Sequence, residues 1–174
     1  FAVLTGLAMA LAPASQAQER WAGFADRLFP HWYSLEAGLP HDVVTALAQD
    51  GQGFIWVGTQ GGLARWDGYR FKSYQPNPQD PHALLDNYIE TLHTDRFGRL
   101  WIGTSSGGLA RYDAAQDRFV LYQAGKDGLS NVAVRAVVDD EKNGLWIATD
   151  GGLDRLDFAS NRIASFGQRQ GGLL

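Results

Sequence analysis

The chain has 174 residues, of which 45% are apolar and 20% charged, and this balance is typical of a globular protein of about one domain. Its formal net charge of −4 argues against a general nucleic-acid binder, because no basic stripe is available to meet phosphates. The chain contains no cysteine, which excludes disulfides and thiolate metal sites. Its 21 glycines exceed ordinary usage and indicate many tight turns.

The N-terminal 17 residues begin with an apolar run and end in small residues. An apolar run of about 11 residues is too short to cross a bilayer of about 30 Å as a helix. This pattern is typical of a secretory signal peptide, with cleavage expected after Ala17, and a buried N-terminal helix is the alternative. We therefore expect residues 1–17 to be a signal-peptide remnant and residues 18–28 a linker, and we expect export to the periplasm or beyond. Because the first residue is Phe1 rather than Met, we also expect the chain to be a fragment.

A tryptophan-centred stretch recurs three times along the chain. It reads GFIWVGT at 53–59, GRLWIGT at 98–104 and NGLWIAT at 143–149. Trp56, Trp101 and Trp146 are therefore spaced by 45 residues, since both 101 − 56 and 146 − 101 equal 45. A period of this size marks a repeat protein. Each copy is an apolar run bounded by glycine, which is typical of a buried strand.

Each repeat predicts four short strands joined by short turns. The expected strands are 43–48, 54–59, 63–66 and 70–74, then 89–93, 100–104, 109–112 and 118–122, then 134–138, 145–149, 153–156 and 162–166. Four such strands at this period describe one blade of a β-propeller. The prediction is an all-β partial propeller with blades at 43–74, 89–122 and 134–166, preceded by a closing strand at 29–34. Because propellers have about 4–8 blades, we expect further blades beyond Leu174.

Arginine and aspartate residues keep fixed places in every repeat. An arginine stands two residues before an aspartate in Arg65/Asp67, Arg111/Asp113 and Arg155/Asp157. A catalytic pair is usually needed only once, so we interpret these pairs as hairpin caps or links between repeats. A second aspartate, at positions 50, 95 and 140, follows each first strand and is expected to cap a turn. The three tryptophans are expected to lie buried between adjacent sheets.

Several of these motifs resemble the two-component regulator propeller repeats. They are Gly38-Leu39-Pro40 followed by Val44, the segments 50–59 (DGQGFIWVGT) and 67–71 (DGYRF), Gly62-Leu63, and 80–84 (DPHAL) before Asn87 and Ile89. The resemblance runs from about Phe29 to Leu174. It implies a periplasmic sensor domain of a bacterial membrane receptor, followed there by a β-sandwich, a membrane helix and a cytoplasmic output domain. The output would be a histidine kinase or a diguanylate cyclase, and the full receptor is expected to be a homodimer.

No catalytic constellation is visible, so we expect this chain itself not to be an enzyme and to need no cofactor. His31, His41, His82 and His93 lack the spacing of metal ligands. In a propeller, the loops from the fourth to the first strand and from the second to the third share one face. Their polar, non-identical residues predict a site for a polar small molecule or glycan, and they are His41, Asp42, Gln60, Asp86, Asn87, Ser105, Ser130, Asn131 and Asp150. A solvated rim without a ligand is the alternative.

The residues thus lead to a sensor hypothesis, in which ligand binding shifts the arrangement of receptor domains. An extracytoplasmic propeller enzyme acting on glycans and a protein-binding scaffold are the two alternatives. The segment 75–86 adds a long loop, because its three prolines forbid a central strand. Long loops on rigid scaffolds often bind partners.

Overall fold

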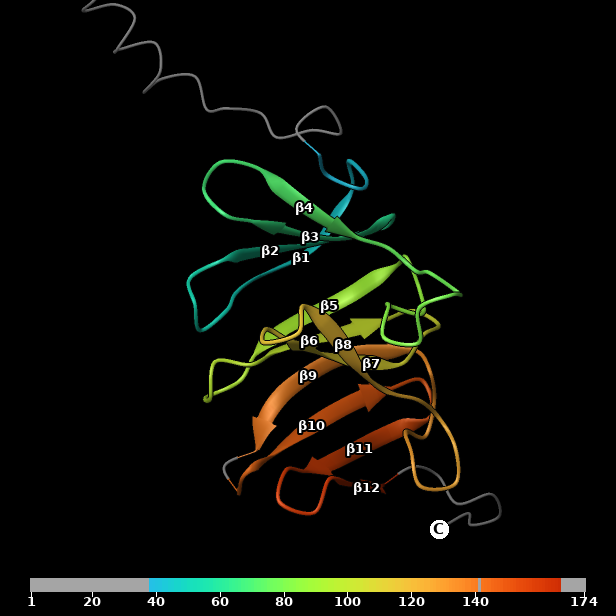
Figure 1. The fold of residues 1–174 in the computed structure, drawn as a ribbon. Coiled ribbons are helices and arrows are strands. Elements are labelled where there is room, and N and C mark those ends of the chain that lie inside the picture. The colour runs from blue at the N-terminus through green and yellow to red at the C-terminus, as the bar shows by residue number, and fades with distance from the viewer. Residues whose placement is uncertain (1–37, 141, 167–174) are drawn as a thin grey trace, which may run out of the picture. The chain divides into compact units, whose positions relative to one another are not determined.

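The computed structural model describes residues 38–140 and 142–166, and these residues form three four-stranded antiparallel sheets (Figure 1). Within each sheet the strands are ordered as they occur in the chain, and we call the sheets blades 1, 2 and 3. The prediction of an all-β fold built from four-stranded blades is confirmed. The expected signal peptide, linker and closing strand lie outside the described residues. Within those residues, no helix has the length and apolarity needed to cross a membrane.

The strand bounds lie close to those expected from the repeat. Blade 1 consists of β1 (Val44–Gln49), β2 (Ile55–Thr59), β3 (Gly62–Trp66) and β4 (Phe71–Tyr74). Blade 2 consists of β5 (Ile89–Thr94), β6 (Leu100–Thr104), β7 (Leu109–Asp113) and β8 (Arg118–Tyr122). Blade 3 consists of β9 (Val134–Asp140), β10 (Gly144–Thr149), β11 (Gly152–Asp157) and β12 (Arg162–Ser165). The largest difference is at β9, which ends at Asp140 rather than at 138.

The repeated aspartates cap turns, as interpreted from their recurrence, and the arginine of the first repeat joins two blades. Asp67 accepts hydrogen bonds from the backbone N–H groups of Tyr69 and Arg70, each at 2.9 Å, and so closes the turn between β3 and β4. Arg65 reaches across to blade 2 and donates to the Tyr112 hydroxyl at 2.8 Å.

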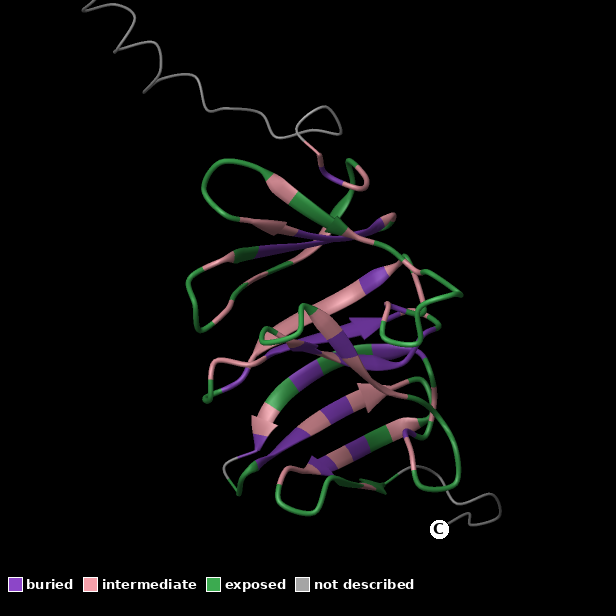
Figure 2. Cartoon of the chain, viewed as in Figure 1, coloured by how far each residue is buried: buried purple, intermediate pink, exposed green. Residues whose placement is uncertain are grey.

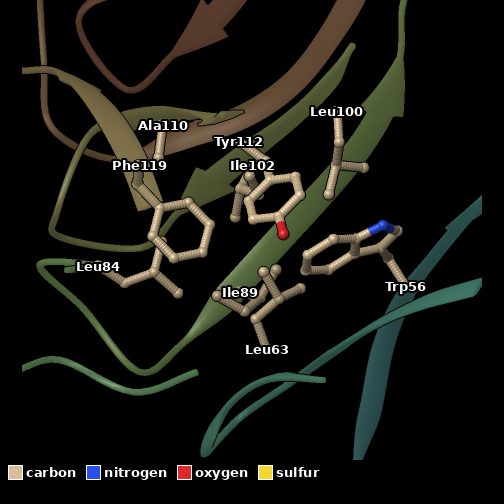
Figure 3. Packing of buried hydrophobic residues seen from close by; sticks show 9 residues of the cluster. All are labelled: Trp56, Leu63, Leu84, Ile89, Leu100, Ile102, Ala110, Tyr112 and Phe119. Atoms are coloured by element: carbon tan, nitrogen blue, oxygen red, sulfur yellow. The ribbon is translucent and has the colours of Figure 1, made fainter. Parts of the chain in front are cut away.

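The apolar core lies between neighbouring blades, and the second and third strands carry most of the buried residues (Figure 2). Trp56 packs its ring against Tyr112 of blade 2 with centroids 4.6 Å apart. Around it gather the other members of the cluster in Figure 3, which are Leu63, Leu84, Ile89, Leu100, Ile102, Ala110 and Phe119. Leu84 comes from the long loop, so this segment helps to close the joint between blades 1 and 2.

Burial of the tryptophans follows the prediction in two of three cases. Trp56 and Trp101 are 0% and 1% exposed. Trp146 is only partly buried, so the expectation is wrong for this residue. It packs against Phe166 of its own blade, with ring centroids 5.5 Å apart. The reason is its place on blade 3, because no further sheet among the described residues covers that side.

Neighbouring blades fit together through a branched side chain seated on a glycine. The first strands pack side by side, β5 against β1 and β9 against β5. Ile89 at the start of β5 lies over Gly58, and Val134 at the start of β9 lies over Gly103. The position of Gly103 has no room for a side chain, since an added Cβ would lie 2.6 Å from Thr91 Cγ2 and 2.7 Å from Val134 Cγ1.

We expect Gly103→Ala to destabilise the fold by about 1–3 kcal/mol, because the new methyl group overpacks the joint between blades 2 and 3. The midpoint of urea unfolding measures the change. Gly125→Ala is the matched control, because no heavy atom lies within 4 Å of a Cβ added there. Equal midpoints for the two variants would contradict the tight fit at Gly103.

Candidate functional site

The antiparallel blades separate the loops into two faces. The turns from second to third strands and the loops from fourth to first strands lie at one end of the sheets, on the right in Figure 1. We call this end, formed by residues 38–43, 60–61, 75–88, 105–108, 123–133 and 150–151, the predicted face. All nine residues expected to form a site belong to it. The turns from first to second and from third to fourth strands lie at the opposite end.

Four of the nine residues hold the loops of the predicted face in shape. The Asp86 carboxylate accepts hydrogen bonds from the backbone N–H groups of Ser106 at 2.7 Å and Tyr88 at 3.2 Å. Ser130 donates both its N–H and its hydroxyl to the buried Asp154 carboxylate, at 2.8 and 2.9 Å. Asn131 and His41 each accept a hydrogen bond from the backbone N–H two residues ahead, that of Ala133 and of Val43 respectively. Their side chains therefore serve local structure.

Gln60 makes a contact between blades and Asp150 pairs with an arginine of its own blade, while Asp42 and Asn87 are exposed. The Gln60 side-chain amide of blade 1 donates to the Tyr88 hydroxyl, next to blade 2, at 3.3 Å. The backbone N–H of Ser105 donates to the Tyr88 carbonyl at 3.1 Å, so Tyr88 is fixed from both sides. Asp150 lies in the turn between β10 and β11, where it faces Arg135.

Arg135, the second residue of β9, lies next to the predicted face and binds carboxylates of two blades. Its guanidinium donates to both carboxylate oxygens of Asp150, at 2.8 and 2.7 Å, and to Glu90 of blade 2 at 2.5 Å. Forked guanidinium–carboxylate pairs of this kind are geometrically specific. Together with the Gln60–Tyr88 contact, these groups form what we call the mouth network, which is Gln60, Tyr88, Glu90, Arg135 and Asp150.

The mouth network keeps its charges and faces water. Hydrogen bonding and charge from Arg135 hold the pKa of Asp150 below its ordinary value, against a smaller opposing effect of desolvation. The same pair raises the pKa of Arg135. The side chains of Arg135 and Asp150 are 49% and 48% exposed, so a ligand can reach them. Two carboxylates and one guanidinium leave one negative charge in excess.

Tyr88, Glu90 and Arg135 were not among the predicted site residues. Glu90 and Arg135 lie in strands rather than in loops, and Tyr88 is the last residue of the loop between β4 and β5. The repeat nevertheless contains a sequence pattern that distinguishes Glu90 and Arg135. Thr45, Glu90 and Arg135 stand one period of 45 residues apart, yet they differ in size and charge. Positions that vary while the tryptophans stay constant are the ones a repeat protein can adapt to a ligand.

The opposite face carries a recess that the prediction did not include. A cavity of about 420 Å³ is lined by the three segments 50–52, 97–100 and 111–115. A smaller one, of about 210 Å³, lies beside the long loop, where the backbone N–H of Phe119 donates to the His82 carbonyl at 3.0 Å. In the part of the chain that the structure describes, no group of three or more histidine, aspartate or glutamate side chains could hold a metal ion.

Comparison with known proteins identifies the repeat. The model of the family described as two component regulator propeller matches residues 38–61 and 83–106. These two segments are two-component regulator propeller repeats. Each matched segment runs from a loop of the predicted face through the first two strands of a blade to the next turn. These repeats therefore contain Gln60, Tyr88 and Glu90 of the mouth network.

The proteins to which this chain is similar are much longer than the matched part. The extracellular domain of a hybrid two-component system from B. thetaiotaomicron, BT3049, is 28% identical with a TM-score of 0.74, covering 79% of this chain and 20% of that one. Histidine kinase P4 of Formosa agariphila is 43% identical over 47 residues, which are 27% of this chain and 3% of the kinase. Virginiamycin B lyase of Staphylococcus aureus is 13% identical with a TM-score of 0.56, covering 77% of this chain and 44% of the lyase, and this likeness shows the fold alone. The chain thus spans only a small part of its two-component relatives.

Proposed function

We propose that the chain is the extracytoplasmic sensing part of a two-component receptor and that its mouth network recognises a polar small molecule or glycan. The likeness to an extracellular domain of a hybrid two-component system supports the location. The local identity with a histidine kinase supports the kind of receptor. In the parent protein the signal passes across the membrane to a histidine kinase or a diguanylate cyclase, and two receptor chains act as a homodimer.

One observation carries this proposal, which is that the mouth network joins three blades. Gln60 belongs to blade 1, Glu90 to blade 2, and Arg135 and Asp150 to blade 3. A ligand that touches these groups therefore contacts three separate repeats at once. Binding can transmit a signal only if the ligand has different affinities for two arrangements of the protein. Contacts shared between blades provide such a difference, because they change when one blade shifts against the next.

The two alternatives have less support. A propeller enzyme acting on glycans draws on the likeness to virginiamycin B lyase, which extends only to the fold. A protein-binding scaffold needs a broad exposed surface, and the polar, ion-paired mouth network is better suited to a small polar ligand. Turnover of an oligosaccharide by the chain would support the enzyme. A stable protein complex formed without any small ligand would support the scaffold.

The mouth network can be tested with a matched pair of arginine variants. A panel of neutral oligosaccharides, acidic oligosaccharides and amino acids is titrated into the full chain by calorimetry, and the same compounds are applied to the parent receptor with a reporter of its output. For any compound that binds, we expect Arg135→Ala to weaken binding roughly ten- to hundredfold, because a charged hydrogen-bond partner is lost.

Arg70→Ala is the control, since Arg70 is highly exposed and lies in a turn of the opposite face. It should leave binding and output unchanged. Equal binding by wild type and Arg135→Ala would remove the mouth network from the site. Loss of binding only in variants of the opposite recess, such as Gln52→Ala, would move the site to that face.

A further inference from the structure

A histidine and an aspartate face each other across the joint between blades 2 and 3. Nε2 of His93, in β5, lies 3.5 Å from Oδ1 of Asp139, in β9. Both atoms are buried, and neither has a hydrogen-bond partner in the structure. Buried polar atoms without partners are uncommon in native proteins and each calls for an explanation. The two side chains are each 25% exposed, so protons can exchange with solvent.

The charged groups nearest to this pair lie in the turn after β5. The turn after β5 contributes Asp95, Arg96 and Arg99, of which Asp95 and Arg99 pair with each other at 2.6 Å. Arg96 donates its backbone N–H to Oδ2 of Asp139 at 3.0 Å, and its side-chain Nε lies 3.9 Å from the same oxygen. These contacts keep one oxygen of Asp139 occupied and leave Oδ1 for His93.

The strands that pack against β5 add few further charges. The strands β1, β2 and β6 contain no titratable residue. On β9, the Asp140 carboxylate is bound by Arg155 at 2.5 Å, and the Arg135 guanidinium belongs to the mouth network near the other end of the strand. Glu90, also on β5, binds Arg135. His93 is therefore the group whose change of charge alters the interaction with Asp139.

We propose that His93 and Asp139 form a pH-sensitive latch between blades 2 and 3. Histidine side chains ordinarily change charge between about pH 5 and 8. When the ring is protonated, Nε2–H donates to Asp139 and a charged pair joins the blades. When the ring is neutral, the charge attraction is lost. Because protonation creates the pair, the latch stabilises the joint at acidic pH, and its contribution disappears as the pH rises. The latch is independent of the ligand proposed for the mouth network.

A double-mutant cycle on the full chain at two pH values tests the latch. His93→Gln, Asp139→Asn and the double variant are unfolded in urea at pH 5.5 and pH 8.0. We expect the two positions to be coupled about two- to fivefold in the folding equilibrium constant at pH 5.5, and not to be coupled at pH 8.0. The matched control is a cycle of Arg135→Gln and Asp150→Asn, whose coupling should be the same at both pH values because arginine stays charged.

Equal coupling at the two pH values, or none at pH 5.5, would overturn the latch. A second measurement applies to the folded chain and does not depend on unfolding. NMR correlation of the imidazole nitrogens detects whether Nε2 of His93 carries a proton that is hydrogen-bonded to Asp139, and this signature should be present at pH 5.5 and absent in Asp139→Asn. The same nitrogen signals in wild type and in this variant would also reject the proposal.

Discussion

Trp101→Ala is expected to lower the free energy of unfolding by about 3–5 kcal/mol, which is the usual cost of removing a buried aromatic side chain. The Trp101 ring is 1% exposed and stacks on Phe158 of blade 3, with centroids 5.8 Å apart and planes at 12°. It also packs against Tyr122 at 5.6 Å. Urea unfolding followed by circular dichroism measures the loss. The large effect is expected because the indole fills space that belongs to two sheets at once.

Trp146→Ala provides the matched control, since it is the same substitution at the same repeat position. Trp146 is only partly buried and packs against Phe166 of its own blade. Its removal should therefore cost clearly less than that of Trp101. If the two variants lost equal stability, burial between adjacent blades would not be the source of the tryptophan contribution.

The period of 45 residues made the fold predictable from the sequence. Once three equivalent tryptophans are aligned, glycine pairs and aspartates mark the same turns in every repeat, and the strands follow between them. The partial exposure of Trp146 was not predictable from the period, because the period identifies equivalent positions without showing which of them have a neighbouring sheet. Gly103 and Ala148 also occupy the same place in the repeat but differ in side chain. The period alone therefore does not show how closely a neighbouring strand packs at each of them.

The candidate site was predictable only in its location. Antiparallel topology places the loops of the predicted face together, so His41, Asp86 and Ser130 were expected on the same side. A polar loop residue can hold a turn or bind a ligand, and the sequence does not separate these roles. The hydrogen bonds of Asp86 to two backbone N–H groups show that its side chain holds the loop. The Arg135–Glu90 contact joins residues 45 apart in the chain, and such pairings depend on how adjacent blades are packed.

Asp95→Ala is the second substitution for which a large loss is expected, about 3–5 kcal/mol, because it leaves buried partners of a charged group unpaired. The Asp95 side chain is fully buried. It accepts hydrogen bonds from the Trp101 indole N–H at 2.8 Å and from Arg99 Nε at 2.6 Å. It also accepts from the backbone N–H groups of Phe97 at 2.9 Å and Arg99 at 3.0 Å. One carboxylate thus holds the turn, the core tryptophan and an arginine.

Asp67→Ala is the matched control for the loss of a turn cap. Asp67 also accepts two backbone hydrogen bonds in a turn, but it is exposed, so water replaces it there. A clearly smaller loss of stability than in Asp95→Ala is expected, measured by urea unfolding at pH 7. Similar losses in the two variants would mean that the turn cap alone, without the buried contacts to Trp101 and Arg99, explains the role of Asp95.

The pH dependence of the Asp95→Ala effect gives an independent check. Burial opposes ionisation of Asp95, but the hydrogen bonds from Trp101 and Arg99 outweigh it and hold the pKa of the carboxyl below its ordinary value of 3.8. A carboxyl with a lowered pKa in the folded state stabilises the fold above the unfolded value and loses this contribution as the pH falls through the folded value. The stability difference between wild type and Asp95→Ala should therefore be largest near neutral pH and shrink below about pH 3.8. A difference that stays constant from pH 7 into this acidic range would show that the charge of Asp95 does not stabilise the blade.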